Sequence, residues 1–169
     1  DYDYDVLIIG SGPAGESAAL NAAKHQLRTL VVENRPLVGG ACTHRGTIPS
    51  KALRHAVKQV MRFNSNPLYR KVGDARRLTY PELLANASGI IDKQVVMRSK
   101  FYARNYINLT HGEASFVDPH TVAIREEDGG ITQVSARDIV IATGSHPYHP
   151  EDVDFSHPRV YDRDRKSTR

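Results

Sequence analysis

The sequence predicts an α/β fold with a parallel βαβ core, a long helix and a small antiparallel β-meander. Three observations support this fold class. An apolar, β-branched run ends at a glycine-rich turn, a helical pattern and a second apolar run follow it directly, and beyond Ile107 the hydrophobic period changes from helical spacing to alternation. The 169 residues are 40% hydrophobic, so we expect one compact domain with a buried core.

The first elements form a strand, a helix and a strand. The apolar run from Tyr4 to Ile9 stops at Gly10, which is typical of a strand buried on both faces. Pro13 suits the first position of a helix because its missing N–H is not needed there, and alanines continue a helical face to about residue 25. Thr29 to Glu33 is the second predicted strand. A strand, a helix and a second strand that follow one another this closely predict a parallel pair of strands with a right-handed crossover.

The middle of the chain is predicted to be helical and the end to be β. Apolar residues at helical spacing predict helices over about 49–63 and 81–106, and Thr79 with Glu82 has the spacing of a capping box before the second of these. Residues 64–78 are polar and rich in turn formers. The stretches "NLTHGEASFV", "TVAIR" and "ITQVSARDIVIATG" are predicted to be the strands of the meander, with a turn at "EDGG".

Charge and cysteine content exclude several classes of protein. Twenty-three Lys and Arg against nineteen Asp and Glu give a net charge of +4, and the basic residues are scattered, which does not favour nucleic-acid binding. A single cysteine allows no intrachain disulfide, so we expect a reducing compartment, the cytoplasm. The acidic opening "DYDYD" and the shortness of every apolar run indicate neither export nor membrane insertion.

The glycine-rich turn carries the pattern GxGxxG between the first strand and the first helix. Gly10 permits the tight turn, Gly12 lets a pyrophosphate approach the backbone, and Gly15 lets the helix pack closely on the strand. The helix N-terminus then faces the phosphates. Glu33, at the end of the second strand, can accept hydrogen bonds from a ribose, and a carboxylate there disfavours a 2′-phosphate. This combination favours a Rossmann-like dinucleotide site and disfavours the alternative, a glycine-rich turn that binds no ligand. It does not distinguish FAD from NAD.

Several motifs together resemble one family. "GSGPAG", "VVEN", "GGACTHRGTIPSKALRHA", "GEASFVD" and "IVIATGSHPYHP" are similar to the flavin disulfide reductase superfamily of class I pyridine nucleotide-disulfide oxidoreductases, and in particular to its soluble pyridine nucleotide transhydrogenases. The similarity runs from about Tyr4 to Tyr161. It implies FAD as cofactor and a Si-specific NAD(P)⁺ transhydrogenase activity, in which hydride passes between NADPH or NADP⁺ and NAD⁺ or NADH through FAD.

The segment that holds the lone cysteine departs from the disulfide-reducing members. The resemblance places Cys42 and Thr47 where those members carry a redox pair of cysteines, and Thr47 takes the flavin-proximal position. Relay through a disulfide needs two sulfurs, and threonine can neither attack nor leave as one, so this pair cannot support disulfide reduction. Reduced flavin can still return a hydride to a second nicotinamide. Cys42 is therefore expected to be unpaired and without a redox role.

The resemblance also implies the other site residues. Lys51 is expected beside the flavin N5, where its positive charge would stabilise the anionic reduced flavin. The remaining residues expected along FAD are Pro13, Ala14, Asn34, Arg35, Pro36, Leu37, Val38, Gly39, Gly40, Ala41, Cys42, Gly112, Ala114, Ala142, Thr143, Gly144 and Ser145. No metal site is expected, because His146 and His149 lie between prolines without a set of carboxylates or thiols.

The resemblance predicts a chain that is one segment of a longer enzyme. We expect residues 1–161 to be the first segment of an FAD-binding domain, residues 162–169 to be a charged, frayed end, and the NAD(P)-binding and dimerisation domains of the family to be absent. Such a fragment is expected to bind flavin weakly and to be inactive alone, while its parent is a homo-oligomer. Two alternatives stay open: a non-catalytic FAD- or ADP-binding module, and a degenerate relative of dihydrolipoamide dehydrogenase or mercuric reductase without the redox disulfide.

Overall fold

The computed structural model describes residues 1–71, 73–75 and 77–162 and divides into two compact units. The first unit comprises Asp1–Cys42 and Val95–His146, and the second comprises Thr43–Gln94 and Pro147–Arg169. The assignment of residues 1–161 to one FAD-binding domain stays a prediction. Of the end expected to be frayed, residues 163–169 lie outside the described residues.

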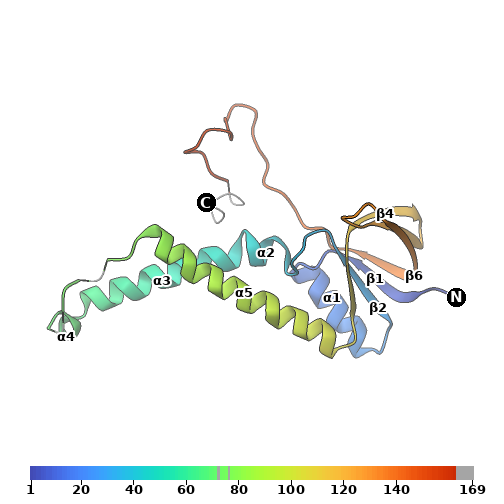
Figure 1. The fold of residues 1–169 in the computed structure, drawn as a ribbon, viewed down its shortest axis with the longest axis horizontal. Coiled ribbons are helices and arrows are strands. Elements are labelled where there is room, and N and C mark those ends of the chain that lie inside the picture. The colour runs from blue at the N-terminus through green and yellow to red at the C-terminus, as the bar shows by residue number, and fades with distance from the viewer. Residues whose placement is uncertain (72, 76, 163–169) are drawn as a thin grey trace. The chain divides into compact units, whose positions relative to one another are not determined.

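A six-stranded sheet forms the centre of the first unit (Figure 1). The strands lie in the order β3-β2-β1-β6-β5-β4. Pairing is parallel from β3 to β6 and antiparallel from β6 to β4, so β6 belongs to both parts. The last strand in the chain serves both parts: its first half pairs with β5 and its second half with β1. The strands are β1 (Tyr4–Ile9), β2 (Thr29–Glu33), β3 (Asn108–His111), β4 (Glu113–Asp118), β5 (Thr121–Arg125) and β6 (Ile131–Ile141).

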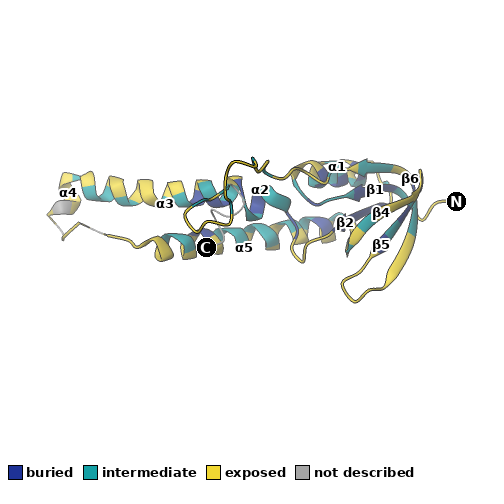
Figure 2. Ribbon diagram, turned by 90° about the horizontal axis from the view of Figure 1, so that it is seen from above, coloured by how far each residue is buried: buried dark blue, intermediate teal, exposed yellow. Residues whose placement is uncertain are grey.

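Alternating side chains of β1 and β2 build a core on each face of the parallel sheet. Ile8 and Val31 pack on one face against α1 (Pro13–Lys24) and Tyr102. Leu7 and its neighbours on β2 pack on the opposite face against β5. All five residues of β2 are buried, as Figure 2 shows in dark blue. The prediction that Tyr4–Ile9 forms a strand buried on both faces is confirmed: helices cover one face of β1, and the antiparallel strands cover the other.

The predicted βαβ unit is confirmed, but the predicted meander is partly wrong. "NLTHGEASFV" is two strands instead of one: β3 pairs parallel with β2 at the sheet edge, and β4 begins after Gly112. A Cβ at Gly112 would stand 2.7 Å from the Arg125 carbonyl oxygen, so glycine lets the chain leave the edge of β2 and turn back along β5. Alternation identifies strands but does not reveal which of them pair in parallel.

The helices begin and end close to their predicted limits. The two long ones are α3 (Thr47–Ser65) and α5 (Tyr80–Arg104). Two short helices were not predicted: α2 (Gly40–His44) lies within the second glycine turn, and α4 (Pro67–Arg70) follows Asn66, whose side chain accepts a hydrogen bond from the Leu68 amide. Short helices escape periodicity because they complete too few turns for an apolar face to repeat.

The second unit is largely helical. Pro49 and Leu53 of α3 and Leu84 and Ile91 of α5 line a small cavity of about 20 Å³. The Glu82 carboxylate accepts hydrogen bonds from both the backbone amide and the hydroxyl of Thr79, at 2.7 and 2.8 Å, which confirms the predicted capping interaction at the start of α5. Among the described residues, no helix combines the length and the apolar character needed to cross a membrane.

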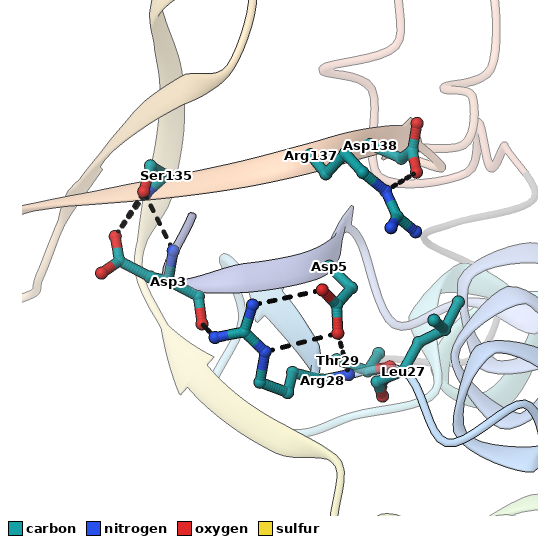
Figure 3. A network of polar contacts seen from close by, with 8 residues as sticks. All are labelled: Asp3, Asp5, Leu27, Arg28, Thr29, Ser135, Arg137 and Asp138. Carbon is teal, nitrogen blue, oxygen red and sulfur yellow. Dashed lines mark hydrogen bonds and ion pairs between the residues drawn. The ribbon is translucent and has the colours of Figure 1, made fainter. Parts of the chain in front are cut away.

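A polar network ties the amino ends of the central strands together (Figure 3). The Arg28 guanidinium donates to both carboxylate oxygens of Asp5 at 3.2 and 3.3 Å, and to the Asp3 carbonyl at 3.1 Å. The Asp3 carboxylate accepts from the amide and hydroxyl of Ser135. These hydrogen bonds lower the pKa of Asp5 and of Asp3 below the ordinary value of 3.8. The network therefore joins β1, β2 and β6 at the end of the parallel strands opposite to Gly10.

Arg28→Gln should lower the midpoint of urea unfolding at neutral pH, because it removes the guanidinium donors of the Asp5 carboxylate and leaves only the amide of residue 28, which donates to it at 2.8 Å. Since the folded-state pKa of Asp5 lies below the unfolded value, this stabilisation is complete above the unfolded pKa and is lost as the pH falls through the folded one. The gap between variant and wild type should be widest at neutral pH and should narrow as the pH falls below the ordinary Asp pKa of 3.8.

Arg137→Gln is the matched control, since Arg137 makes an exposed ion pair with its neighbour Asp138 in the same region. The charge of Arg137 makes only the smallest contribution to the lowered pKa of Asp5, so the unfolding midpoint of this variant should stay much closer to the wild type than that of Arg28→Gln across the pH range. An Arg28→Gln gap of constant size between about pH 7 and pH 3 would contradict the role given to Asp5.

Candidate functional site

Backbone geometry explains the first and third glycines of the GxGxxG turn. Gly10 has φ of +107°, a conformation that residues with side chains rarely adopt, and a Cβ there would stand 2.4 Å from the Ala142 carbonyl oxygen. A Cβ at Gly15 would stand 1.9 Å from the Gly10 carbonyl oxygen. Both glycines are therefore required by the contact of β1 with α1 and with the end of β6.

Gly12 differs from these two because space is open beside it. Its φ of −66° is accessible to any residue, and the nearest atom to a Cβ there is the Cα of Gly40, at 4.0 Å. The two glycine turns thus face each other through backbone alone, with no side chain between them. Pro13 occupies the first helical position, and the amide of Glu16 closes the first turn on the Gly12 carbonyl at 2.8 Å. The helix N-terminus and an open backbone surface together form a cradle for an anionic group.

The buried side chains of Ser11 and Glu33 hold the cradle together. The Glu33 carboxylate accepts hydrogen bonds from the hydroxyl of Ser11 and, at 3.0 Å, from its amide. The Ser11 hydroxyl in turn accepts from the amide of Gly39 at 3.0 Å. Ser11 is fully buried and Glu33 is 5% exposed. One hydroxyl thereby links the first glycine turn, the end of β2 and the second glycine turn.

The segment after β2 is fixed by hydrogen bonds between the backbone of Arg35 and the side chains of Glu33 and His111. The amide of Arg35 donates to the second oxygen of Glu33 at 2.9 Å, and its carbonyl accepts from Nδ1 of His111 at 2.7 Å. Residues 34–37 are exposed, whereas Val38 and Gly39 are buried. The carboxylate that sequence analysis assigns to a ribose therefore already accepts three hydrogen bonds from protein groups.

Ser11, His111 and a polar group formed by Glu16, Arg98 and Tyr102 are not among the site residues predicted from the sequence. In that group the Arg98 guanidinium of α5 lies 2.7 Å from the Glu16 carboxylate, with side chains 13% and 19% exposed. Tyr102, one turn further along α5, is 2% exposed, and burial together with the nearby Glu16 charge raises the pKa of its hydroxyl well above its usual range. Only the polar residue between two glycines, in "GSG", gives a signal that could have pointed to Ser11.

The structure brings most of the expected residues of the first unit together. The amide of Ala142 donates to the Ile9 carbonyl at 2.8 Å, so residues 142–145 leave β6 beside Gly10, and Gly144 takes a φ of +78°. The amide of Gly112 donates to the Glu33 carbonyl at 3.0 Å, and Ala114 follows on β4. These positions surround the carboxyl ends of β1, β2 and β6, where open α/β sheets bind ligands.

Three further expected residues lie on the helices that follow the second glycine turn. Cys42 is a half-buried free thiol in α2. Thr47 is the first residue of α3, and Lys51 lies one turn later; both are exposed. Their roles beside a flavin stay predictions.

The histidines near the end of the described chain contact neighbours within the second unit. His149 stacks on the ring of Phe155, and its Nε2 lies 2.6 Å from the Asp162 carboxylate. The described residues contain no group of three or more His, Cys, Asp or Glu side chains that could hold a metal ion.

Comparison with known proteins identifies relatives along almost the whole chain. Residues 4–167 match the family model described as "Pyridine nucleotide-disulphide oxidoreductase". A soluble pyridine nucleotide transhydrogenase of Ectopseudomonas mendocina is 56% identical over 163 residues, and one of Colwellia psychrerythraea is 52% identical over 163 residues. The matched region covers 96% of this chain and 35% of each relative, so the chain spans about a third of their length.

Solved structures confirm the fold. The HOCl-induced flavoprotein disulfide reductase RclA from Escherichia coli superposes with a TM-score of 0.78 at 23% sequence identity, covering 98% of this chain and 34% of that chain. Its complex with Cu(II) superposes with a TM-score of 0.73 over 88% of this chain. The α/β, Rossmann-like fold class predicted from the sequence is thereby confirmed.

Gly15→Ala should lower the free energy of unfolding by about 1–3 kcal/mol, because the added methyl group collides with backbone that cannot move aside freely. Gly89→Ala is the matched control: Gly89 lies inside α5 with nothing within 4 Å of an added Cβ, so the change should raise the free energy of unfolding by up to about 1 kcal/mol. Urea unfolding of the two variants measures both. Equal stability of Gly15→Ala and wild type would contradict the close contact of α1 with Gly10.

Proposed function

We propose the function of this chain from its family. The chain belongs to the pyridine nucleotide-disulphide oxidoreductases. Within it, the chain supplies the FAD-binding segment of a soluble NAD(P)⁺ transhydrogenase, an oxidoreductase that moves hydride between NADPH or NADP⁺ and NAD⁺ or NADH. The observation that carries this proposal is the backbone cradle of Gly12 and Gly40 beside the N-terminus of α1. The names of relatives at 52–56% identity support the activity.

The residues of the cradle fit FAD. Gly12 and the amides of the first turn of α1 would bind the pyrophosphate, since no side chain lies between Gly12 and Gly40. A carboxylate oxygen can accept about two hydrogen bonds, so Glu33 Oε1, which receives one from Arg35, retains capacity for a ribose hydroxyl. Residues 34–41 and the turns at Gly112 and Ala142 would follow the rest of the cofactor. When bound, FAD supplies a centre that accepts a hydride from one nicotinamide and returns it to another.

The pair Cys42 and Thr47 favours transhydrogenation over disulfide reduction. The chain contains one cysteine, so no dithiol can form within it. The Thr47 hydroxyl cannot exchange with a disulfide, so a hydride that reaches the flavin would not leave through this pair, which favours its return to a nicotinamide. This chemistry also argues against a dihydrolipoamide dehydrogenase-like activity.

Lys51 is proposed to act on the flavin electrostatically. An ammonium beside N5 would favour the reduced, anionic ring and so the acceptance of hydride. Its position in the first turns of α3, four residues after Thr47, follows the family motif. The nicotinamide substrates, a homo-oligomeric parent and a cytoplasmic location remain proposals from the resemblance.

A second candidate is a binding module that holds FAD or ADP without catalysis. It is favoured because the hydrogen bonds that build the cradle all join residues of the first unit. Binding of FAD without hydride transfer in any longer protein that contains this segment would support it.

Gly12→Ala should weaken FAD binding by at least about tenfold, because overpacking of about 1.4 kcal/mol corresponds to that factor. The unfolding midpoint of this variant should not change. Its Cβ would meet no protein atom closer than 4.0 Å, but it would enter the space assigned to the pyrophosphate. Titration of the 169-residue chain with FAD, followed by flavin fluorescence, measures the effect. Failure of the wild-type chain to bind FAD or ADP would contradict the proposed function.

Hydride transfer can be tested in a chimera in which this chain replaces the matching segment of the Pseudomonas aeruginosa relative, to which it is 53% identical over 163 residues. The chimera should transfer hydride from NADPH to thio-NAD⁺, and Thr47→Cys should not abolish the transfer. Lys51→Met should lower kcat by about tenfold to a hundredfold, because it removes the charge that stabilises the reduced flavin.

Lys58→Met is the control for Lys51→Met, since Lys58 is also exposed and lies on the same helix. It should leave kcat unchanged. A flavin-loaded chimera that transfers no hydride would overturn the proposed activity while leaving FAD binding intact.

A further inference from the structure

His111 lies at the edge of the candidate site. It is the last residue of β3, and its Cα pairs with that of Glu33 in the parallel register of β2 and β3. Side chains of paired residues in neighbouring parallel strands point to the same face of a sheet. The imidazole and the Glu33 carboxylate therefore share one face at the carboxyl ends of their strands.

The hydrogen bond of His111 determines which ring nitrogen carries the proton. Nδ1 lies 2.7 Å from the carbonyl oxygen of Arg35, and a carbonyl oxygen can only accept, so Nδ1 is the donor. In the neutral ring Nε2 is then an acceptor. His111 is exposed, and no described residue provides a hydrogen bond to Nε2.

The same hydrogen bond fixes the turn that follows Glu33. The Arg35 amide donates to the Glu33 carboxylate, the Arg35 carbonyl accepts from His111, and the Gly112 amide donates to the Glu33 carbonyl. Arg35 is thus held on both sides of its Cα. The position of the carboxylate depends in part on an imidazole from the neighbouring strand.

We propose that His111 binds the adenosine end of the dinucleotide. Its Nδ1–H holds the turn after Glu33, and its Nε2 accepts a hydrogen bond from the adenosine of a ligand whose phosphates lie in the cradle of Gly12 and Gly40. This assignment rests on the proposed function, since it needs an adenosine-bearing ligand in that cradle. It adds a side chain to an end of the site where the family resemblance assigns Gly112 and Ala114.

Isothermal titration of the full 169-residue chain with ADP tests the proposal. His111→Ala should weaken ADP binding by about threefold to tenfold, the range for the loss of one uncharged hydrogen bond. Binding of inorganic pyrophosphate, which has no adenosine, should not change. His120→Ala is the matched control, because Nδ1 of His120 also donates to backbone carbonyls, those of Ala136 and Arg137, beside the amino end of β1. It should bind ADP as the wild type does.

Proton NMR of the wild-type chain gives a second readout that does not depend on any variant being folded. ADP should shift the ring resonances of His111 and leave those of His120 in place. Equal ADP affinity in His111→Ala and wild type, an equal loss in His120→Ala, a matching loss for pyrophosphate, or unshifted His111 resonances in the ADP complex would overturn the assignment. A wild-type chain that binds neither ADP nor FAD would instead overturn the proposed function from which it follows.

Discussion

The hydrogen bond between the Ser11 hydroxyl and the Glu33 carboxylate is the interaction on which the candidate site depends. A buried carboxylate is tolerated only when its oxygens accept hydrogen bonds, and Ser11 and Arg35 supply three of them. The same hydroxyl accepts from Gly39, so the two glycine turns are placed by one atom. Hydrogen bonds among protein groups therefore suffice to define the positions of both glycine turns.

The two ends of the parallel strands have different tasks. At their amino ends, Arg28, Asp5 and Ser135 join the strands through exposed ion pairs and hydrogen bonds. At their carboxyl ends, the Glu33 carboxylate is buried and hydrogen-bonded to Ser11 and Arg35, and glycine and backbone groups form the surface that a pyrophosphate would approach. The polar network therefore joins the strands at the end opposite to the candidate site, where backbone stays accessible beside Gly12.

The residues that could be predicted from sequence are those whose pattern repeats or whose chemistry is local. Continuous apolar runs revealed β1 and β2, and Gly10, Gly12 and Gly15 revealed the turn, because each depends on neighbours in sequence. The pairing of β3 with β2 and the hydrogen bond from His111 to Arg35 join residues far apart in the chain, and no periodicity encodes them. The structure brings many of the glycines and backbone positions that the resemblance assigned to FAD to the carboxyl ends of the parallel strands, but the resemblance gave no sign of the side chains that hold them there.

The ion pair of Glu16 and Arg98 explains how a carboxylate can lie at the start of α1 beside a cradle for phosphate. A negative charge in the first turn stabilises the helix, yet it also repels an anionic ligand that uses the same positive end. Arg98, largely buried and 2.7 Å from that carboxylate, cancels its charge through a short contact that solvent screens little. The pair leaves the field of the helix amides available to a ligand. Since Arg98 and Tyr102 lie one turn apart on α5, the long helix contributes to the site as an electrostatic support as well as a cover for the core.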